Sequence, residues 1–218
     1  MSTFPNAPRI LKGGLVLLDP TTAAVLRIIA LQYNPDTLSR TLQMQAAGGE
    51  GDRLEALRLK GPPTETIKLE AEIDATDQLE FPAEHRGATQ LGIFPQLAAL
   101  ETIVYPGSAE LELGNSLAGA GTLEIAPAEA PLTLFIWSKT RIVPVRITDF
   151  SITEEAFDPA LNPIRAKVSL GMRVLSVNDL GFRHKGGSLF MSYLKNKELL
   201  ARVGPGGALF SMGVTGVP

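Results

Sequence analysis

The chain has 218 residues, of which 44% are hydrophobic, a length and composition that fit one domain with a sizeable core. Its formal net charge of −3 predicts no general affinity for nucleic acid or for an anionic membrane surface. The absence of cysteine excludes disulfides, thiolate catalysis and thiolate metal sites.

The sequence shows no sign of export or membrane insertion. The N-terminus has no basic segment followed by an apolar run, and the longest apolar runs fall far short of the roughly 18 residues that a membrane span needs. We therefore expect no membrane span, and a cytoplasmic protein unless it leaves the cell within a larger assembly.

The N-terminal part of the chain predicts three strands and a long loop. After a loose segment at 1–13, strands are expected at 14–18, 24–33 and 37–44, the first two joined by a turn at Asp19-Pro20-Thr21-Thr22. The following stretch, 46–63, is rich in glycine and charge and predicts an exposed loop that contacts partners. The residues singled out in this loop are Gly48, Gly49 and Arg53.

The middle of the chain alternates between strand, helix and loop. Apolar residues take every second position in 64–75, so a strand is expected there with Glu70, Glu72 and Asp74 on its outer face. A helix is expected at 95–105, where proline fits the first turn and Pro106 ends it. Residues 107–130 predict a second loop, and 132–137 another strand.

Two long strands form the centre of the prediction. In 164–174 the apolar residues share one parity, opposite to Arg165, Lys167 and Arg173. In 141–152 the apolar parity slips by one residue at Asp149, which indicates a β-bulge. We expect an antiparallel hairpin whose loop packs against the body of the protein and contacts partners. The loop residues that carry this expectation are Phe157, Asp158 and Leu161.

The C-terminal part predicts a helix over 188–203 with Ser188 as its N-cap. The side chains expected to pack inward are Phe190, Tyr193, Leu194 and Leu200. A Gly/Pro linker and a short apolar tail follow at 204–218. The fold class is therefore mainly β, an antiparallel sandwich or partly open barrel over 14–203 with one short flanking helix and a C-terminal helix.

Catalytic and cofactor motifs are missing. His85 and His184 lie far apart without metal-ligand spacing, and both are interpreted as ordinary surface histidines. Gly186-Gly187-Ser188 is interpreted as a plain loop before a helix in preference to an anion site. We expect no enzyme activity, no metal and no cofactor.

The basic strand face at Arg165, Lys167 and Arg173 has two interpretations. It is either an ordinary solvated face or the complement of the acidic face at 70–74, met within one sheet or between neighbouring subunits. Without interleaved aromatic residues it is a poor platform for nucleic acid.

Four segments of the chain resemble the tube-like proteins of bacterial contractile injection systems. They are 31–40 (LQYNPDTLSR), 67–75 (IKLEAEIDA), 97–106 with its short helix, and 144–170 (PVRITDFSITEEAFDPALNPIRAKVSL). The likeness is to the baseplate subfamily that joins the central spike to the inner tube. Better-known members continue into a LysM-type module, which this sequence lacks.

The resemblance implies a tail-tube fold of two packed sheets and a hexameric ring whose strands line a channel. It implies the spike, the inner tube and other baseplate proteins as partners, in a particle that is either released or docked at a membrane. The charged residues at 70–74 and 165–173 are then expected at a subunit interface or the lumen. Two alternatives remain open: a regular inner-tube protomer, and a monomeric β-barrel that binds a small molecule in an apolar cavity.

Overall fold

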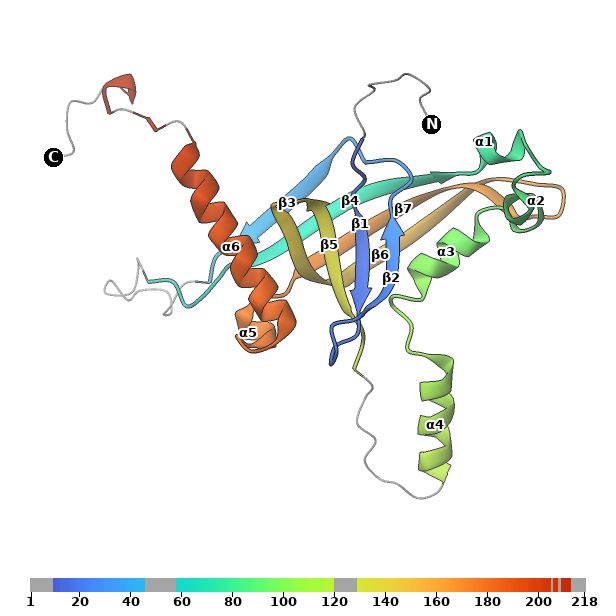
Figure 1. Ribbon diagram of the computed structural model, residues 1–218, viewed down its shortest axis with the longest axis horizontal. Coiled ribbons are helices and arrows are strands. Elements are labelled where there is room, and N and C mark those ends of the chain that lie inside the picture. Colours follow the sequence, from blue (N-terminus) through green and yellow to red (C-terminus); the bar gives the residue numbers. More distant parts are fainter. Residues whose placement is uncertain (1–9, 46–57, 120–128, 205, 208, 213–218) are drawn as a thin grey trace.

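The computed structural model describes residues 10–45, 58–119, 129–204, 206–207 and 209–212. Seven strands and six α-helices are present in these ranges (Figure 1). The strands are β1 (Gly14–Leu18), β2 (Val25–Ala30), β3 (Leu38–Gln43), β4 (Thr64–Asp74), β5 (Leu132–Ser138), β6 (Arg141–Phe157) and β7 (Pro163–Val174). The helices are α1 (Thr76–Leu79), α2 (Arg86–Leu91), α3 (Phe94–Glu101), α4 (Ser108–Gly119), α5 (Val177–Leu180) and α6 (Lys185–Val203), followed by a 3₁₀ turn at Leu209–Met212.

All seven strands belong to one antiparallel sheet in the order β2-β1-β5-β6-β7-β4-β3. The two edge strands, β2 and β3, are consecutive in the chain, and the segment from Ala30 to Leu38 spans at most about 28 Å when fully extended. The sheet must therefore curl so that its edges approach each other. Figure 1 shows the result: β1, β2 and β5 run across the long strands β4, β6 and β7. The predicted mainly β, partly open architecture is confirmed, with one curved sheet in place of two separate ones.

The central hairpin of β6 and β7 agrees with the prediction. Alternate residues of β7 from Ala166 to Val174 are buried, and the pairing with β6 shifts register between Ile147 and Asp149. The bulge that the sequence predicted at Asp149 is thus present. It lets both halves of β6 present apolar side chains to the same core, even though their sequence parity differs.

The core lies on the concave side of the sheet. Buried side chains from five strands and α3 form one cluster, to which Phe190 and Tyr193 of α6 also contribute. The strand residues with no exposed surface are Ile67, Val143, Ala166, Val168 and Met172. A smaller cluster on the other side of the sheet joins Leu18, Leu132 and Leu134 to the start of α6.

Two of the helices, α4 and α6, differ from the prediction. The expected 107–130 loop contains α4 over Ser108–Gly119, where alanine, leucine and glutamate outweigh the glycines. The C-terminal helix begins at Lys185, not after Ser188, because Nδ1 of His184 accepts a hydrogen bond from the Gly186 amide at 3.1 Å and caps it. His184 therefore has a structural role that its interpretation as a surface histidine missed.

The tip of the β6–β7 hairpin is also different from the expectation. Its apolar residues do not pack down, since Phe157 is 50% and Leu161 is 77% exposed. The turn is instead held by its own polar groups: the Asp158 carboxylate accepts hydrogen bonds from the Ala160 and Asn162 amides at 2.8 Å. The loop keeps its shape without a hydrophobic anchor. Leu200, expected to pack inward, is also exposed at 58%.

Candidate assembly surface

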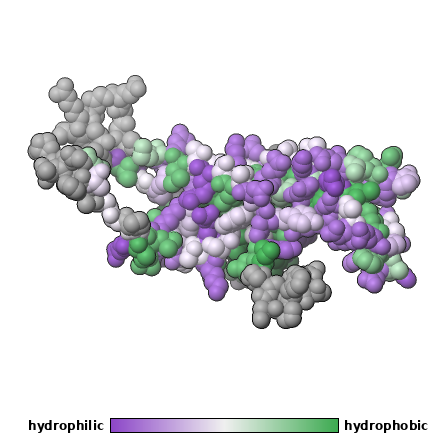
Figure 2. Space-filling view, turned by 90° about the horizontal axis from the view of Figure 1, so that it is seen from above, coloured by the Kyte–Doolittle hydropathy of each residue, from purple (hydrophilic) through white to green (hydrophobic). Residues whose placement is uncertain are grey.

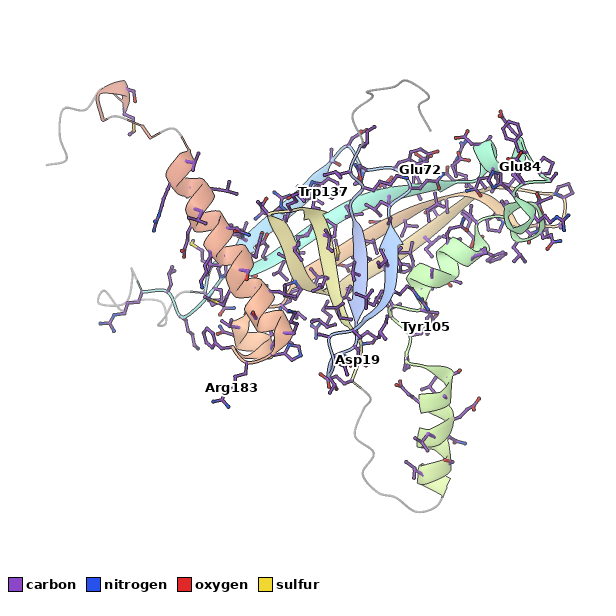
Figure 3. The ribbon with its side chains drawn as sticks, in the orientation of Figure 1. Asp19, Glu72, Glu84, Tyr105, Trp137 and Arg183 are labelled. Carbon is purple, nitrogen blue, oxygen red and sulfur yellow. The ribbon has the colours of Figure 1, made fainter. Side chains whose placement is uncertain are left out.

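The convex face of the long strands is hydrophilic over its whole described width. Cross-strand register places the polar parities of β3, β4, β7 and β6 side by side. We call this surface the polar face. Its residues are Ser39, Thr41, Gln43, Lys68, Glu70, Glu72, Asp74, Asp149, Ser151, Thr153, Glu155, Arg165, Lys167, Ser169 and Arg173. Figure 3 shows Glu72 among the side chains along β4, and Figure 2 shows a largely hydrophilic surface along the middle of the molecule.

The acidic and basic residues of the polar face meet within one sheet. Arg165 lies opposite Asp74, with Nε 2.7 Å from Oδ2, and its Nε is 3.9 Å from a carboxylate oxygen of Glu72. The intramolecular form of the predicted charge complementarity is therefore present. Because Arg165 is 42% exposed, solvent screens the ion pair, and its main effect is to fix strand register.

The surroundings of Asp74 determine its pKa and so the charge of this ion pair. Burial alone raises the pKa of Asp74, but hydrogen bonds from Thr76 and Arg165 outweigh the burial and lower it below its ordinary value. Asp74 therefore stays ionised throughout the neutral range.

The remaining predicted charges are separated from this pair. Lys167 contacts Glu155 of β6 at 3.4 Å, and Glu70 lies opposite Ser169 without a basic partner across the strand. Arg173 sits eight residues along β7 from Arg165, about 27 Å away at the usual rise of a strand. The predicted basic face is thus a row along one strand, not a compact site.

Arg173 is held by a different element. It lies directly opposite Arg146 of β6, a like-charge pair, and donates to Oδ1 of Asp179 in α5 at 2.6 Å. Burial raises the pKa of Asp179, while hydrogen bonds from Ser176 and the charge of Arg173 lower it more. Asp179 offsets the repulsion between the two arginines.

A buried carboxylate that the sequence interpretation missed joins α6 to the sheet. Glu65 of β4 is only 3% exposed and accepts hydrogen bonds from Arg40 at 2.8 Å, Tyr193 at 2.9 Å and Lys197 at 2.8 Å. The Lys197 ammonium also lies 4.1 Å from the centre of the Tyr193 ring. The sequence does indicate that Glu65 needs partners, because it falls on the buried parity of 64–75, where an unpaired carboxylate is costly.

These contacts set the charge state of Glu65. Burial raises the pKa of Glu65, but the hydrogen bonds and positive charges of Lys197, Tyr193 and Arg40 together lower it below its ordinary value. The carboxylate is therefore ionised at neutral pH, and α6 is attached by charge as well as by packing.

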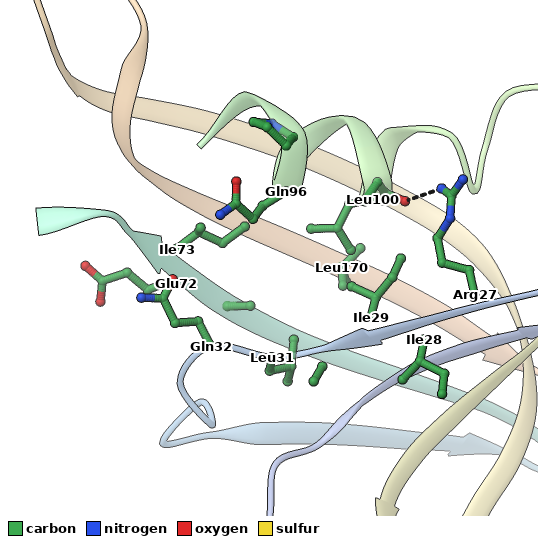
Figure 4. A pocket seen from close by; sticks show the side chains of 14 residues that line it. Arg27, Ile28, Ile29, Leu31, Gln32, Glu72, Ile73, Gln96, Leu100 and Leu170 are labelled. Carbon is green, nitrogen blue, oxygen red and sulfur yellow. Dashed lines mark hydrogen bonds between the residues drawn. The ribbon is translucent and has the colours of Figure 1, made fainter. Parts of the chain in front are cut away.

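An apolar cleft of about 340 Å³ lies between β2 and α3 (Figure 4). Ile29 and Leu31 line one side, and Ile73, Leu100 and Leu170 line the others. At its rim, Nη1 of Arg27 donates to the Ala99 carbonyl at 3.2 Å and to the Thr102 hydroxyl. The polar groups at the cleft are thus largely engaged with the protein itself.

Large apolar side chains are exposed on the flanks of the molecule. They occur on edge strand β2, at the end of α3, on α4, at the hairpin tip and at the end of α6, and Figure 3 shows Tyr105 where the chain leaves α3 for α4. Exposed apolar surface on this scale is typical of contact sites with other proteins. Residues of this kind on the flanks include Ile28, Tyr105, Leu111, Leu113, Leu161, Leu199 and Val203.

Three of the six predicted partner-contact residues lie within the described part of the chain. Phe157, Asp158 and Leu161 lie together at the exposed hairpin tip, where hydrogen bonds from the Asn162 side chain and amide lower the pKa of Asp158. Gly48, Gly49 and Arg53 lie outside the described residues.

The described ranges contain neither a cluster of metal-binding side chains nor a membrane-spanning helix. No group of three or more histidine, aspartate or glutamate side chains there is arranged to hold a metal ion. No helix among these residues is long and apolar enough to cross a membrane.

Comparisons with known proteins found remote likenesses only. No protein-family model and no curated protein matches the chain. Among solved structures, the tail of an empty gene transfer agent particle with C6 symmetry is 13% identical, with a TM-score of 0.28, covering 75% of this chain and 90% of the other. A chain of the native gene transfer agent virion is 14% identical, with a TM-score of 0.26, covering 74% and 90%. Similarity at this level supports no assignment of function to the chain.

Proposed function

We propose that the protein is a structural, non-enzymatic subunit of the baseplate of a bacterial contractile injection particle, made in the cytoplasm. In this role it forms a hexameric ring that joins the central spike to the inner tube and provides the first layer on which the tube assembles. The observation that carries the proposal is the polar face: four adjacent strands present a broad surface of polar and charged side chains, and Phe157 at the hairpin tip is the one exposed aromatic residue on the outward parity of the described strands.

A channel wall needs such a face. The three longest strands have 11, 17 and 12 residues, so even β4 extends over about 36 Å. A wall of this height stays wetted if its outward residues are predominantly polar, as in wide water-filled barrels. The internal ion pairs of Arg165 and Lys167 keep its charges balanced, so the surface binds no passing cargo strongly.

The flanks of the molecule fit contacts with neighbouring subunits. Exposed Val25, Leu26 and Ile28 on edge strand β2 are unfavourable in an isolated protein, where an open apolar edge invites aggregation. Closure of a ring covers such surfaces in every copy at once. The number six is taken from the sequence resemblance described above.

The copy number per particle tests this role. Quantitative mass spectrometry of purified particles is expected to find six copies of the chain for each trimeric spike. A copy number that increases with tube length would instead identify a regular inner-tube protomer. Absence of the chain from every purified particle would overturn the proposal.

The apolar cleft supports a second candidate function. Its volume of about 340 Å³ is within the range of small-molecule sites, so a monomeric protein that binds an apolar ligand is the rival. A thermal-shift screen with small apolar compounds distinguishes this ligand-binding function from the structural role. Stabilisation that Ala99→Trp abolishes would favour the rival, because a large side chain there fills the cleft.

A further inference from the structure

Two helical segments project from different sides of the molecule. Helix α4 points away from the sheet at one side, and the last turns of α6 extend past the sheet at another (Figure 1). No residue of α4 is buried, and every residue of α6 from Glu198 onward is exposed. A 12-residue helix with no buried residue is marginal in water, so α4 is expected to gain its stability from a partner.

Helix α4 presents an apolar stripe with acidic charge. Leu113 and Leu117 are one turn apart, exposed by 59% and 38%, and Glu110 lies one turn before Leu113 on the same side. The helix contains Glu110 and Glu112 and no basic residue. A partner that covers this stripe must therefore be apolar and basic.

The end of α6 has the complementary composition. Leu199 and Val203 are one turn apart, exposed by 58% and 82%, and lie outside the face of α6 on which Phe190 and Tyr193 pack against the sheet. Lys195 precedes Leu199 by one turn and Arg202 follows it by three residues, so both border the stripe. In the described part of the chain, neither Lys195 nor Arg202 forms an ion pair.

We propose that α4 of one copy packs on the outer stripe of the α6 end, Leu199 and Val203, of the next copy. The inference rests on the proposed ring, and it names the helices that join its members. Because the two surfaces lie on different sides of one chain, the contact is head-to-tail, and repeating it closes a ring or extends a filament. Apolar stripes supply the burial, and opposite charges select the partner.

The charges favour an antiparallel pairing of the two helices. In that orientation Glu110 at the start of α4 lies beside Arg202 at the end of α6, while Leu113 and Leu117 meet Leu199 and the stem of Lys195. The helix dipoles also align favourably, since the positive N-terminus of α4 meets the negative C-terminus of α6.

Disulfide trapping tests the contact directly, because the chain has no native cysteine. Leu113→Cys protein is mixed with Leu199→Cys protein under mild oxidation, with neither variant able to form the bond within its own chain. We expect mixed dimers well above the level given by Leu113→Cys with Ser39→Cys, an exposed control position on β3. Equal trapping in both mixtures, or only Leu113–Leu113 dimers, would overturn the proposed pairing.

Exchanging the charges of Glu110 and Arg202 tests the helix pairing separately from the proposed ring. Glu110→Arg and Arg202→Glu are each expected to weaken self-association about tenfold, and the two together to restore it. If wild-type rings form and neither variant changes them, the helix pairing is wrong and the ring proposal stands. If wild-type protein neither traps nor associates at any concentration, both proposals fall.

Discussion

The side-chain amide of Gln32 forms two hydrogen bonds with the backbone of Asp74. Its Nε2 donates to the Asp74 carbonyl at 2.6 Å, and its Oε1 accepts from the Asp74 amide at 3.0 Å. Gln32 follows edge strand β2, and Asp74 ends β4 near the opposite edge of the sheet. One side chain thus joins the two ends of the curled sheet where no strand pairing does.

Gln32→Ala is expected to lower the free energy of unfolding by about 1–2 kcal/mol, because it leaves two backbone groups of Asp74 without partners. Hydrogen exchange of the Asp74 amide should accelerate more than that of any other β4 amide. Gln43→Ala, on the exposed surface of β3, is the matched control and is expected to change neither quantity. Unchanged exchange at Asp74 would show that the curl is held by other contacts.

Glu65→Gln is expected to destabilise the protein by about 2 kcal/mol. The substitution removes the negative charge that Arg40 and Lys197 share, leaving two partly buried cations together. Urea unfolding measures the effect, with Glu70→Gln on the exposed face of the same strand as control. Equal losses in the two variants would mean that the buried cluster does not anchor α6.

The same carboxylate predicts a dependence on pH. Its pKa is lower in the folded protein than the ordinary 4.5, so its stabilising effect is complete above about pH 5 and is lost as the pH falls through the lowered value. The stability difference between wild type and Glu65→Gln should therefore shrink from pH 7 toward pH 3. A difference that stays constant over this range would contradict the assigned charge state.

Gly92→Ala is expected to cost about 3 kcal/mol or more. Gly92 has φ of +57°, and an added Cβ would lie 2.1 Å from the Pro163 carbonyl oxygen, to which Ile93 donates a hydrogen bond. Gly87→Ala is the control, since nothing lies within 4 Å of its Cβ position in α2 and alanine favours helix. Thermal unfolding of the two variants should shift in opposite directions, and a neutral Gly92→Ala would contradict this packing.

The long strands could be predicted from the sequence because one face of each is buried and the other is not. The parity slip at Asp149 even located the bulge, since one extra residue reverses every later side chain. Alternation also put Arg165 and Asp74 on the outer faces of their strands but left their partners open, and the structure pairs them within one sheet.

The helices and the helix contacts were harder to predict. Leucine and glutamate in α4 indicate helix only weakly, because none of its residues is buried against the described part of the chain. The cap at His184 was missed because histidine is an uncommon N-cap, and Ser188 matched the usual residue type. The contacts of Glu65 join residues more than 120 positions apart, which no local pattern reveals.

The mass of the purified protein in solution tests the central claim most directly. Light scattering over a wide range of concentrations, alone and with a spike protein of the same particle, is expected to find a species of six 23.3 kDa chains, about 140 kDa. A protein that remains a monomer of one chain in every mixture would contradict the ring, and with it the role assigned to the polar face.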